Sequence, residues 1–392
     1  MSFFLSLNLL ETSQKCNSLL LLYLENIPIP TVQPNSSITM LTIPGMSFGD
    51  RRGRFSWCIE EAEALPILEE CYKLGINFFD TANGYSNGVS EEILGKAIAK
   101  FSWPRENIVV ATKLWAPVGH RIVDEKTGKW EDALSMSAED RDKRGYINAY
   151  GLSRKHIFDS VDASLKRLGL EYIDLLQIHR FDPNTPIRET MKALHDIVES
   201  GKVRYIGASS MWAHQLMEMQ YTARMNNWTE FISMQNLHNA TYREEEREMI
   251  PAMQIFGMGM IPWSPVAMGF LTRPHASFKE GSERGASMGG TFIGNAFSDA
   301  DKAINEKIEE IAGKRGVSMA VVATAWSLSK PFMTSPILGM SKVERVREAV
   351  QAVNFELTGE EIEAIDGLYR PKEVIGITVS PNLLKKTSGS GK

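Results

Sequence analysis

Along most of the chain, short apolar runs of strand length alternate with amphipathic segments of helix length. The eight predicted strands are 40–44, 76–80, 108–113, 173–179, 204–208, 231–235, 258–263 and 334–338. The predicted helices are 60–74, 90–101, 154–168, 186–200, 211–226, 243–256, 299–329 with a break near Gly316, and 342–353. Regular repetition of a strand and a helix is typical of parallel α/β folds.

Residue types at the segment ends support this alternation. Gly75, Gly169 and Gly201 each follow an amphipathic run, where a residue in the left-handed conformation commonly ends a helix. The central apolar runs are nearly continuous, as expected for strands that are buried on both faces. We therefore predict an α/β fold, a single-domain (β/α)8 TIM barrel with long loops at its mouth. A doubly wound open sheet produces the same pattern and is the alternative.

The patterns divide the chain into a divergent N-terminal extension at 1–38, a barrel at 39–372 and a C-terminal tail at 373–392. One further helix is predicted at 358–368, with Thr358 as its N-cap and Glu361 at capping-box spacing. Two segments are too long for ordinary connections, namely 114–151 after the third strand and 273–298 after the seventh. Each of them is either a functional loop or a surface insertion.

Composition narrows the class of protein. The chain has 392 residues, a formal net charge of -5, 43% hydrophobic and 23% charged residues, as is ordinary for a soluble globular protein. No excess of positive charge favours nucleic acid or an anionic membrane as a partner. The apolar stretch 19–24 is far shorter than the roughly 20 residues that span a bilayer. Three cysteines without metal-ligand spacing argue against a metal site and fit a cytoplasmic protein.

Ionisable residues end three successive predicted strands. Asp80 ends INFFD, Lys113 ends IVVATK and His179 ends IDLLQIH, while Tyr85 lies in the loop after Asp80. In a parallel barrel the carboxyl ends of the strands converge on one mouth, so these four side chains are expected to meet. A lysine in a dry interior requires a partner, and Asp80 on the neighbouring strand is a suitable one. The set indicates a catalytic site, and a barrel hydrolase using Asp80 and His179 is a weaker alternative.

Longer motifs carry a family resemblance that runs from about residue 46 to residue 371. They are FFDTANGYSNGVSEEILGKAI, LSRKHIFDSVDASLKRLGLEYIDLLQIHRFD, GKVRYIGASSM, YREEEREMIP and PWSP. Through them the chain resembles the aldo-keto reductase superfamily, in particular its group of aryl-alcohol dehydrogenases and norsolorinic acid or versiconal hemiacetal acetate reductases. The resemblance implies that Asp80, Tyr85, Lys113 and His179 form the catalytic tetrad of that family.

The roles implied for the tetrad suit the reduction of a carbonyl group. Hydride transfer leaves charge on the carbonyl oxygen, which must receive a proton, and Tyr85 would be the acid. A free phenol titrates near pH ~10, and a neighbouring ammonium such as that of Lys113 favours the phenolate. Asp80 would hold Lys113 in place, and His179 would donate a hydrogen bond that orients the carbonyl.

The sequence contains no glycine fingerprint of the Rossmann type and no P-loop. The resemblance implies instead that an extended NADP(H) lies across the barrel mouth. By motif, the residues matched to the cofactor are Ser209, Ser210 and Gln235 at the carboxamide, Trp263 on the nicotinamide ring, Ser264, Pro265, Gly269 and Leu271 along the pyrophosphate, and Gly339, Ser341, Lys342 and Arg345 near the last barrel helix. Of these, Lys342 and Arg345 would meet a 2′-phosphate, which favours NADPH over NADH.

The leading hypothesis is an NADPH-dependent reductase of an aromatic or polyketide-derived aldehyde or ketone, with that small molecule as its partner. The resemblance also suggests a place in fungal secondary metabolism. Trp57, Trp115, Trp130 and Trp212 are candidates for an aromatic mouth, with core packing as the other interpretation. The alternative function is a non-catalytic, cofactor-sensing subunit of the same fold, like the potassium-channel β subunits. The oligomeric state is left open.

Overall fold

The structure is a computed structural model that describes residues 41–278 and 297–377. The predicted extension at 1–38, the Gly/Ser-rich part of the segment 273–298 and most of the C-terminal tail lie outside the described residues.

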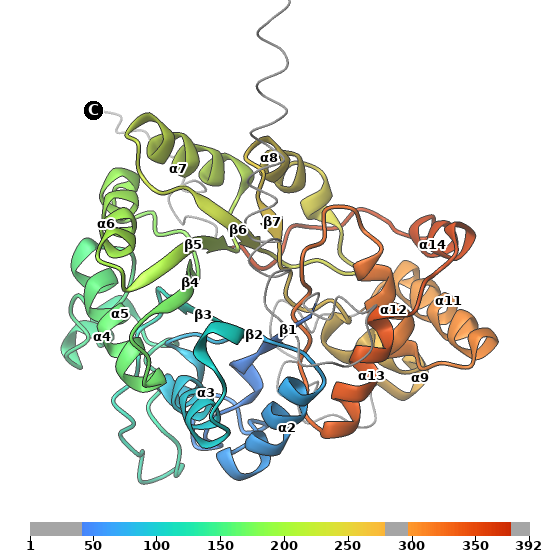
Figure 1. Ribbon diagram of the computed structural model, residues 1–392, viewed down its shortest axis with the longest axis horizontal. Helices are drawn as coiled ribbons and strands as arrows, with labels where there is room; N and C mark the ends of the chain where they lie inside the picture. Colours follow the sequence, from blue (N-terminus) through green and yellow to red (C-terminus); the bar gives the residue numbers. More distant parts are fainter. Residues whose placement is uncertain (1–40, 279–296, 378–392) are drawn as a thin grey trace, which may run out of the picture.

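A curled sheet of seven parallel strands lies at the centre, with its strands in sequence order (Figure 1). The strands are β1 (Thr42–Pro44), β2 (Phe78–Asp80), β3 (Val109–Leu114), β4 (Ile173–Ile178), β5 (Val203–Ser209), β6 (Phe231–Gln235) and β7 (Gly259–Met260). Because all neighbours are parallel, the carboxyl ends of the strands meet at one end of the sheet. The predicted α/β class is therefore confirmed, and an open doubly wound order is not what the structure shows.

The predicted eighth strand takes the form of isolated bridges. Ile337 pairs with Thr42 of β1 and with Trp263 after β7. The backbone N–H of Ile337 donates to Pro262 O at 2.9 Å, and that of Leu338 donates to Thr42 O at 2.9 Å. Proline has no N–H to donate, so Pro262 and Pro336 interrupt regular ladders at this seam. The segment is thus hydrogen-bonded to both edges of the sheet without forming a regular strand.

Helices surround the sheet on its outer face (Figure 1). The α-helices are α2 (Glu61–Lys73), α3 (Val89–Lys100), α4 (Ala138–Lys143), α5 (Arg154–Leu168), α6 (Ile187–Glu199), α7 (Ala213–Met225), α8 (Met249–Ile255), α9 (His275–Phe278), α11 (Asp299–Arg315), α12 (Met319–Leu328), α13 (Val343–Val353) and α14 (Gly359–Asp366). Short 3-10 helices are η2 (Gly45–Ser47), η3 (Tyr85–Gly88), η4 (Arg105–Asn107), η5 (Glu244–Glu246) and η6 (Ala267–Thr272). None of the helices in the described ranges is long and apolar enough to cross a membrane.

Local chemistry explains several helix ends. Gly169 and Gly316, with φ of 65° and 64°, end α5 and α11 in the left-handed conformation that glycine adopts freely. The predicted break near Gly316 is therefore confirmed. Thr358 and Glu361 form the predicted capping box of α14. The prediction of a single helix over 243–256 is wrong. The segment forms η5 and α8 instead, because Pro251 fits only the first turn of a helix.

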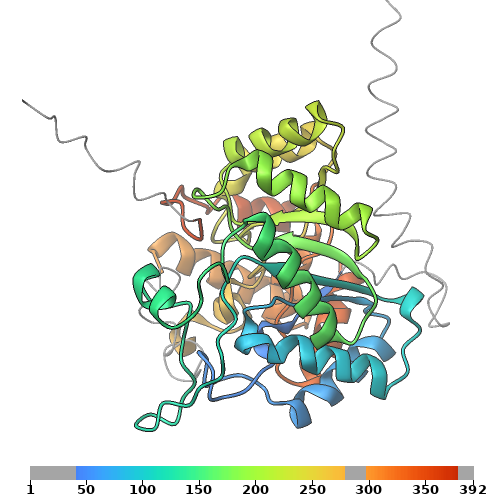
Figure 2. The same ribbon diagram turned by 90° about the vertical axis from the view of Figure 1, so that its left-hand side faces the viewer.

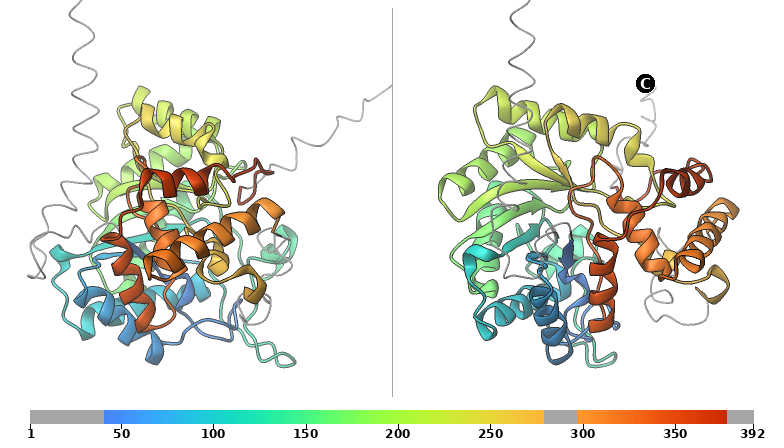
Figure 3. Two further views of the ribbon diagram at one scale, coloured as in Figure 1. Left: turned by 90° about the vertical axis from the view of Figure 1, so that its right-hand side faces the viewer. Right: turned by 45° about the vertical axis from the view of Figure 1, so that its right-hand side comes forward.

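Buried apolar side chains fill both sides of the sheet. A small inner cluster consists of Phe78, Val109, Ala111, Leu175 and Ile261. A large outer cluster lies between the strands and the surrounding helices. A third cluster, which includes the fully buried Trp326, lies with α11 and α12 at the side of the sheet where α9 and α14 are also found (Figure 3). The packed interior leaves the carboxyl ends of the strands as the place for a site.

The segment between β3 and α5 is the longest described connection, as the sequence predicts. It contains α4 and an antiparallel bridge between Val123 and Trp130, which makes a hairpin. Figure 2 shows this teal to green segment projecting from the body of the molecule. Its first residues run close to η3, where Tyr85 lies.

Candidate active site

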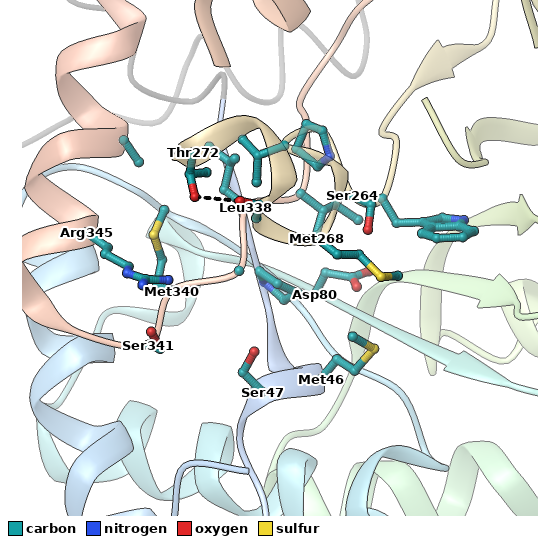
Figure 4. A pocket seen from close by; sticks show the side chains of 18 of the residues that line it. Met46, Ser47, Asp80, Ser264, Met268, Thr272, Leu338, Met340, Ser341 and Arg345 are labelled. Atoms are coloured by element: carbon teal, nitrogen blue, oxygen red, sulfur yellow. Dashed lines mark hydrogen bonds between the residues drawn. The ribbon is translucent and has the colours of Figure 1, made fainter. Parts of the chain in front are cut away.

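A cavity of about 840 Å³ opens at the carboxyl ends of the strands. Asp80 ends β2, His179 follows β4, Ser209 ends β5 and Gln235 ends β6, and all four line this cavity. The opposite wall comes from the segment after residue 336 and from α13 (Figure 4). The volume lies in the upper part of the range of roughly 300–1,000 Å³ that is usual for ligand pockets.

The floor of the cavity is a buried ion pair. The ammonium of Lys113, which is fully buried, donates to the Asp80 carboxylate and to Thr81 O, the latter at 2.9 Å. The other carboxylate oxygen, Asp80 Oδ2, accepts hydrogen bonds from Gln177 Nε2 at 2.8 Å and from Gln235 Nε2 at 3.1 Å. Burial, the largest single effect, disfavours the charged ammonium, but the charges of Asp80 and Tyr85 and their hydrogen bonds with the ammonium together outweigh it and raise the pKa of Lys113.

The backbone after β2 brings Tyr85 next to Lys113. The N–H of Asn83 donates to Lys113 O at 2.9 Å, so the chain continues beside β3 before it turns into η3. Lys113 Nζ then donates to Tyr85 Oη at 3.4 Å. The rings of Tyr85 and His179 meet edge to face, with centroids 5.6 Å apart. The four residues predicted from the strand ends therefore lie together.

Burial sets the protonation of the two rings. It raises the pKa of the Tyr85 phenol, and although the charge of Lys113 acts in the predicted downward direction, it does not overcome burial. Burial, with the nearby charges of Lys113 and Arg180, lowers the pKa of His179 well below its ordinary value. Near neutral pH the site thus holds a protonated phenol and a neutral imidazole, which are a proton donor and a hydrogen-bond donor.

Hydrogen bonds fix the wall formed by β5 and β6. Ser210 adopts a left-handed conformation, with φ of 51°, and its N–H donates to Asn236 Oδ1 at 2.6 Å. Asn236 Nδ2 in turn donates to the buried carboxyl of Glu245 at 2.6 Å. Ser210 Oγ accepts from the indole N–H of Trp263 at 3.3 Å, and Ser209 Oγ donates to the Gln235 carbonyl oxygen at 2.7 Å.

The next wall is a tight backbone turn. Ser264, Met268 and Gly269 have φ of 58°, 56° and 97°, and together with Pro265 they line the cavity. Thr272 Oγ1 donates to Gly269 O at 2.9 Å and closes the turn (Figure 4). Ser264 and Met268 are both seen beside the cavity in the same view. The turn presents backbone together with the side chains of Ser264, Pro265 and Met268 to the cavity.

The far end of the cavity is open. Gly339, Ser341 and Arg345 line it, and Arg345 extends from α13 (Figure 4). Lys342, the N-cap of α13, is exposed and is not part of the lining. Leu271 is fully buried in the cluster around Trp326 and does not line the cavity either. Of the twelve predicted cofactor residues, ten therefore line the cavity and these two do not.

The aromatic residues predicted at the mouth have different positions. Trp57 lines the cavity. Trp115, Trp130 and Trp212 do not, and Trp130 is buried. Core packing is the better interpretation for Trp115, which packs against the large outer cluster, whereas Trp130 lies on the hairpin beside Arg52 and Arg121. Apolar lining comes also from methionines, Met46, Met268 and Met340, which the sequence analysis did not single out.

Several residues of the site were missed by reasoning from the sequence. Gln177 lies two residues before His179 in the same strand direction, so the alternation of strand side chains could have found it. Arg180 lines the cavity and donates to the Gly376 carbonyl oxygen. The charged residues Arg273 and Glu348 line the open end. In the described ranges, no group of three or more His, Cys, Asp or Glu side chains is arranged to hold a metal ion.

Comparison with known proteins gives consistent matches. The model of the aldo/keto reductase family matches residues 41–370. Versiconal hemiacetal acetate reductase from Aspergillus parasiticus is 47% identical over 321 residues, which cover 81% of this chain and 90% of that protein. A putative aryl-alcohol dehydrogenase from Schizosaccharomyces pombe is 46% identical over 340 residues, 86% of this chain and 94% of that protein. An aldo-keto reductase from Alternaria alternata is 44% identical over 330 residues, 83% and 87% of the two chains.

Proposed function

Since this chain belongs to the aldo/keto reductase family, whose members are oxidoreductases acting on carbonyl and CH–OH groups, we propose that it reduces an aldehyde or ketone with NADPH. Tyr85 is the proton donor in this proposal. We also assign residues 39–372 to one (β/α)8 barrel, with 334–338 as its eighth strand. The backbone hydrogen bonds of Ile337 and Leu338 to both edges of the sheet support that assignment.

The residues along the cavity fit a nicotinamide dinucleotide. Amide and hydroxyl groups of Ser209, Ser210 and Gln235 are of the right type for a carboxamide at the closed end. The guanidinium of Arg345 at the open end suits a phosphate, because it can bind two oxygens at once. Between them lies the turn that contains Gly269, where the absence of a side chain lets a ligand approach the backbone. NADPH, when bound, supplies the hydride that the carbonyl carbon accepts.

The observation that carries the proposal is the position of Lys113 Nζ, which contacts both Asp80 and Tyr85 Oη. As the carbonyl oxygen gains negative charge, the Tyr85 phenol donates its proton to that oxygen. The phenolate that remains is stabilised by the Lys113 ammonium 3.4 Å away, and it regains a proton from solvent. The neutral His179 donates a hydrogen bond to the same oxygen and orients it.

An aromatic or polyketide-derived substrate is the finer part of the proposal. Trp57 and Met46 line the cavity together with Tyr85 and His179, and they supply apolar surface for a ring. The names of the relatives, versiconal hemiacetal acetate reductase and putative aryl-alcohol dehydrogenase, point in the same direction for this chain.

The test is the oxidation of NADPH with a panel of substituted benzaldehydes, followed at 340 nm, for the natural chain and for Tyr85→Phe. Removal of the general acid should lower kcat by roughly 10²–10⁴-fold. The dissociation constant of NADPH, measured by fluorescence titration, should change little, because Tyr85 does not hold the cofactor. Equal kcat in both proteins would refute the role of Tyr85. Tight binding of NADPH without turnover in the natural chain would favour a cofactor-sensing subunit.

A further inference from the structure

The backbone that follows Tyr85 is held in an unusual conformation. Ser86 and Asn87, the next two residues, have φ of 48° and 51° and ψ near 43°. Residues with a Cβ rarely adopt this left-handed conformation, and two in succession persist only where their surroundings enforce it. Because the turn starts at Tyr85, the contacts that enforce it also determine where the phenol points.

One set of contacts comes from the connection between β3 and α5. Asn87 Oδ1 accepts a hydrogen bond from the N–H of Gly119 at 3.1 Å. The Asn87 carbonyl oxygen accepts two hydrogen bonds from the Arg121 guanidinium, from Nε at 3.1 Å and from Nη2 at 2.9 Å. The carbonyl oxygen of a left-handed residue is thus bound by a fork of two donors.

Arg121 is itself held from two other sides. Its guanidinium donates to Glu92 Oε1 at 2.6 Å and to Glu92 Oε2 at 3.3 Å, which ties it to α3. It also lies 5.6 Å from the ring centroid of the buried Trp130, on the hairpin of the same connection. Glu92 fixes the direction of the guanidinium, and Trp130 supports its face.

A second set of contacts holds Ser86. Ser86 Oγ accepts from the N–H of Asp50 at 2.8 Å and lies 3.3 Å from the Asp50 carbonyl oxygen, to which it can donate. Gly49 leaves the space for this approach, since a Cβ there would lie 2.3 Å from Ser86 Cβ. The turn is therefore enclosed between the segment after β1 and the segment after β3.

We propose that Arg121 is a positioning residue for Tyr85. By binding the Asn87 carbonyl oxygen, Arg121 keeps the phenol of Tyr85 within hydrogen-bonding distance of Lys113. This inference rests on the proposed function. The distance of 3.4 Å between Lys113 Nζ and Tyr85 Oη is already at the long end for a hydrogen bond, so a small relaxation of the turn breaks it. The connection from β3 to α5 thereby contributes to proton transfer.

The experiment compares Arg121→Met with Arg144→Met. Arg144 lies in the same connection and pairs with Glu131 at 2.8 Å, but it forms no hydrogen bond or ion pair with residues 85–88, so it controls for the loss of a loop ion pair. Arg121→Met should lower kcat at least tenfold, leave KM for NADPH within about twofold and keep the thermal midpoint near that of the control. The basic limb of the pH profile of kcat should move to higher pH, because the phenolate loses the stabilising ammonium.

A second pair of variants tests the conformation directly. Asn87→Gly keeps the carbonyl that Arg121 binds and adopts the left-handed conformation freely, whereas Asn87→Ala keeps the carbonyl and disfavours that conformation. We expect Asn87→Ala to lose several times more kcat than Asn87→Gly. Equal losses in the two variants, or an Arg121→Met enzyme with an unmoved pH profile, would overturn the inference. Full activity of Tyr85→Phe would instead overturn the proposed function, so the two failures are distinguishable.

Discussion

The two ends of the cavity differ in how their charges are held. At the closed end, Lys113 and Asp80 are buried, paired and joined to Gln177 and Gln235 by hydrogen bonds. At the open end, Arg345 is exposed, and its side chain has no ion pair or hydrogen bond to any other described residue. The first arrangement is complete in the protein alone, and the second has donors ready for a ligand.

Desolvation explains the difference. A charge in the interior requires compensation within the protein, because no water reaches it. A charge at the rim is solvated, and it exchanges water for a ligand when one binds. The closed end therefore determines chemistry and stability together, whereas the open end should affect binding with little influence on folding. Three changes test this contrast, from the largest expected effect to the smallest.

The largest effect is expected for Lys113→Met, which leaves the Asp80 carboxylate buried without its cation. The free energy of unfolding should fall by about 3–5 kcal/mol, measured by urea denaturation, and kcat should fall by roughly 10²–10⁴-fold. Lys96→Met is the control, because the ion pair of Lys96 with Glu61 is exposed and should contribute less than about 1 kcal/mol. A Lys113→Met protein as stable as that control would contradict the contrast.

The next effect concerns Glu245, which supports Ser210 through Asn236. Burial raises the pKa of Glu245 to about 7, above the ordinary 4.5. The unfolded carboxyl ionises first as pH rises, so the folded state loses relative stability from about pH 4.5 up to about pH 7, by roughly 3 kcal/mol in all. Glu245→Gln removes this dependence of the free energy of unfolding on pH. The variant should therefore become more stable relative to the natural chain as pH rises.

Urea denaturation at pH 5 and at pH 8 measures that change. Glu230→Gln serves as the matched control, because Glu230 forms an exposed ion pair with Arg224. If the difference between Glu245→Gln and the natural chain is the same at both pH values, burial does not raise the pKa of the Glu245 carboxyl.

The smallest effect is expected at the open end. Arg345→Ala should raise the dissociation constant of NADPH by roughly 10–100-fold, the usual loss for a hydrogen bond to a charged group, and should leave that of NADH within about twofold. Lys342→Ala should weaken NADPH binding by only a few-fold, since Lys342 does not line the cavity. Neither change should alter the thermal midpoint of the protein alone. An equal loss of NADH and NADPH affinity in Arg345→Ala would remove the assignment to a 2′-phosphate.

The closed end could be predicted from the sequence because its geometry follows from strand alternation. Asp80, Lys113 and His179 end consecutive apolar runs, and neighbouring parallel strands place such residues together. The α/β order followed from the same alternation. Tyr85 was expected with them from its place in the loop after Asp80, and the motif resemblance then supplied its role as the acid.

Other features depend on contacts between distant residues and were not predictable. The two hydrogen bonds from the Arg121 guanidinium to the Asn87 carbonyl oxygen join residues 34 positions apart in the sequence, and neither residue stands out in its own segment. The direction of the Tyr85 pKa shift depends on burial, which raises this pKa by more than the charge of Lys113 lowers it. The split of helix 243–256 could have been found from Pro251, whereas the isolated bridges of 334–338 depend on hydrogen bonds to two distant segments, at Thr42 and at Pro262.

The seam between the first and last strand segments has a consequence for how the protein responds to its ligand. Ile337 bridges Thr42 on one side and Trp263 on the other, and the residues that follow it line the cavity. A molecule that contacts both Trp263 and Ser341 therefore joins the carboxyl end of β7 to the segment after Ile337. Its binding free energy adds to the free energy that holds this segment against the sheet. Ligand occupancy and the attachment of the segment are in this way thermodynamically linked, and the segment is held most firmly when a ligand occupies the cavity.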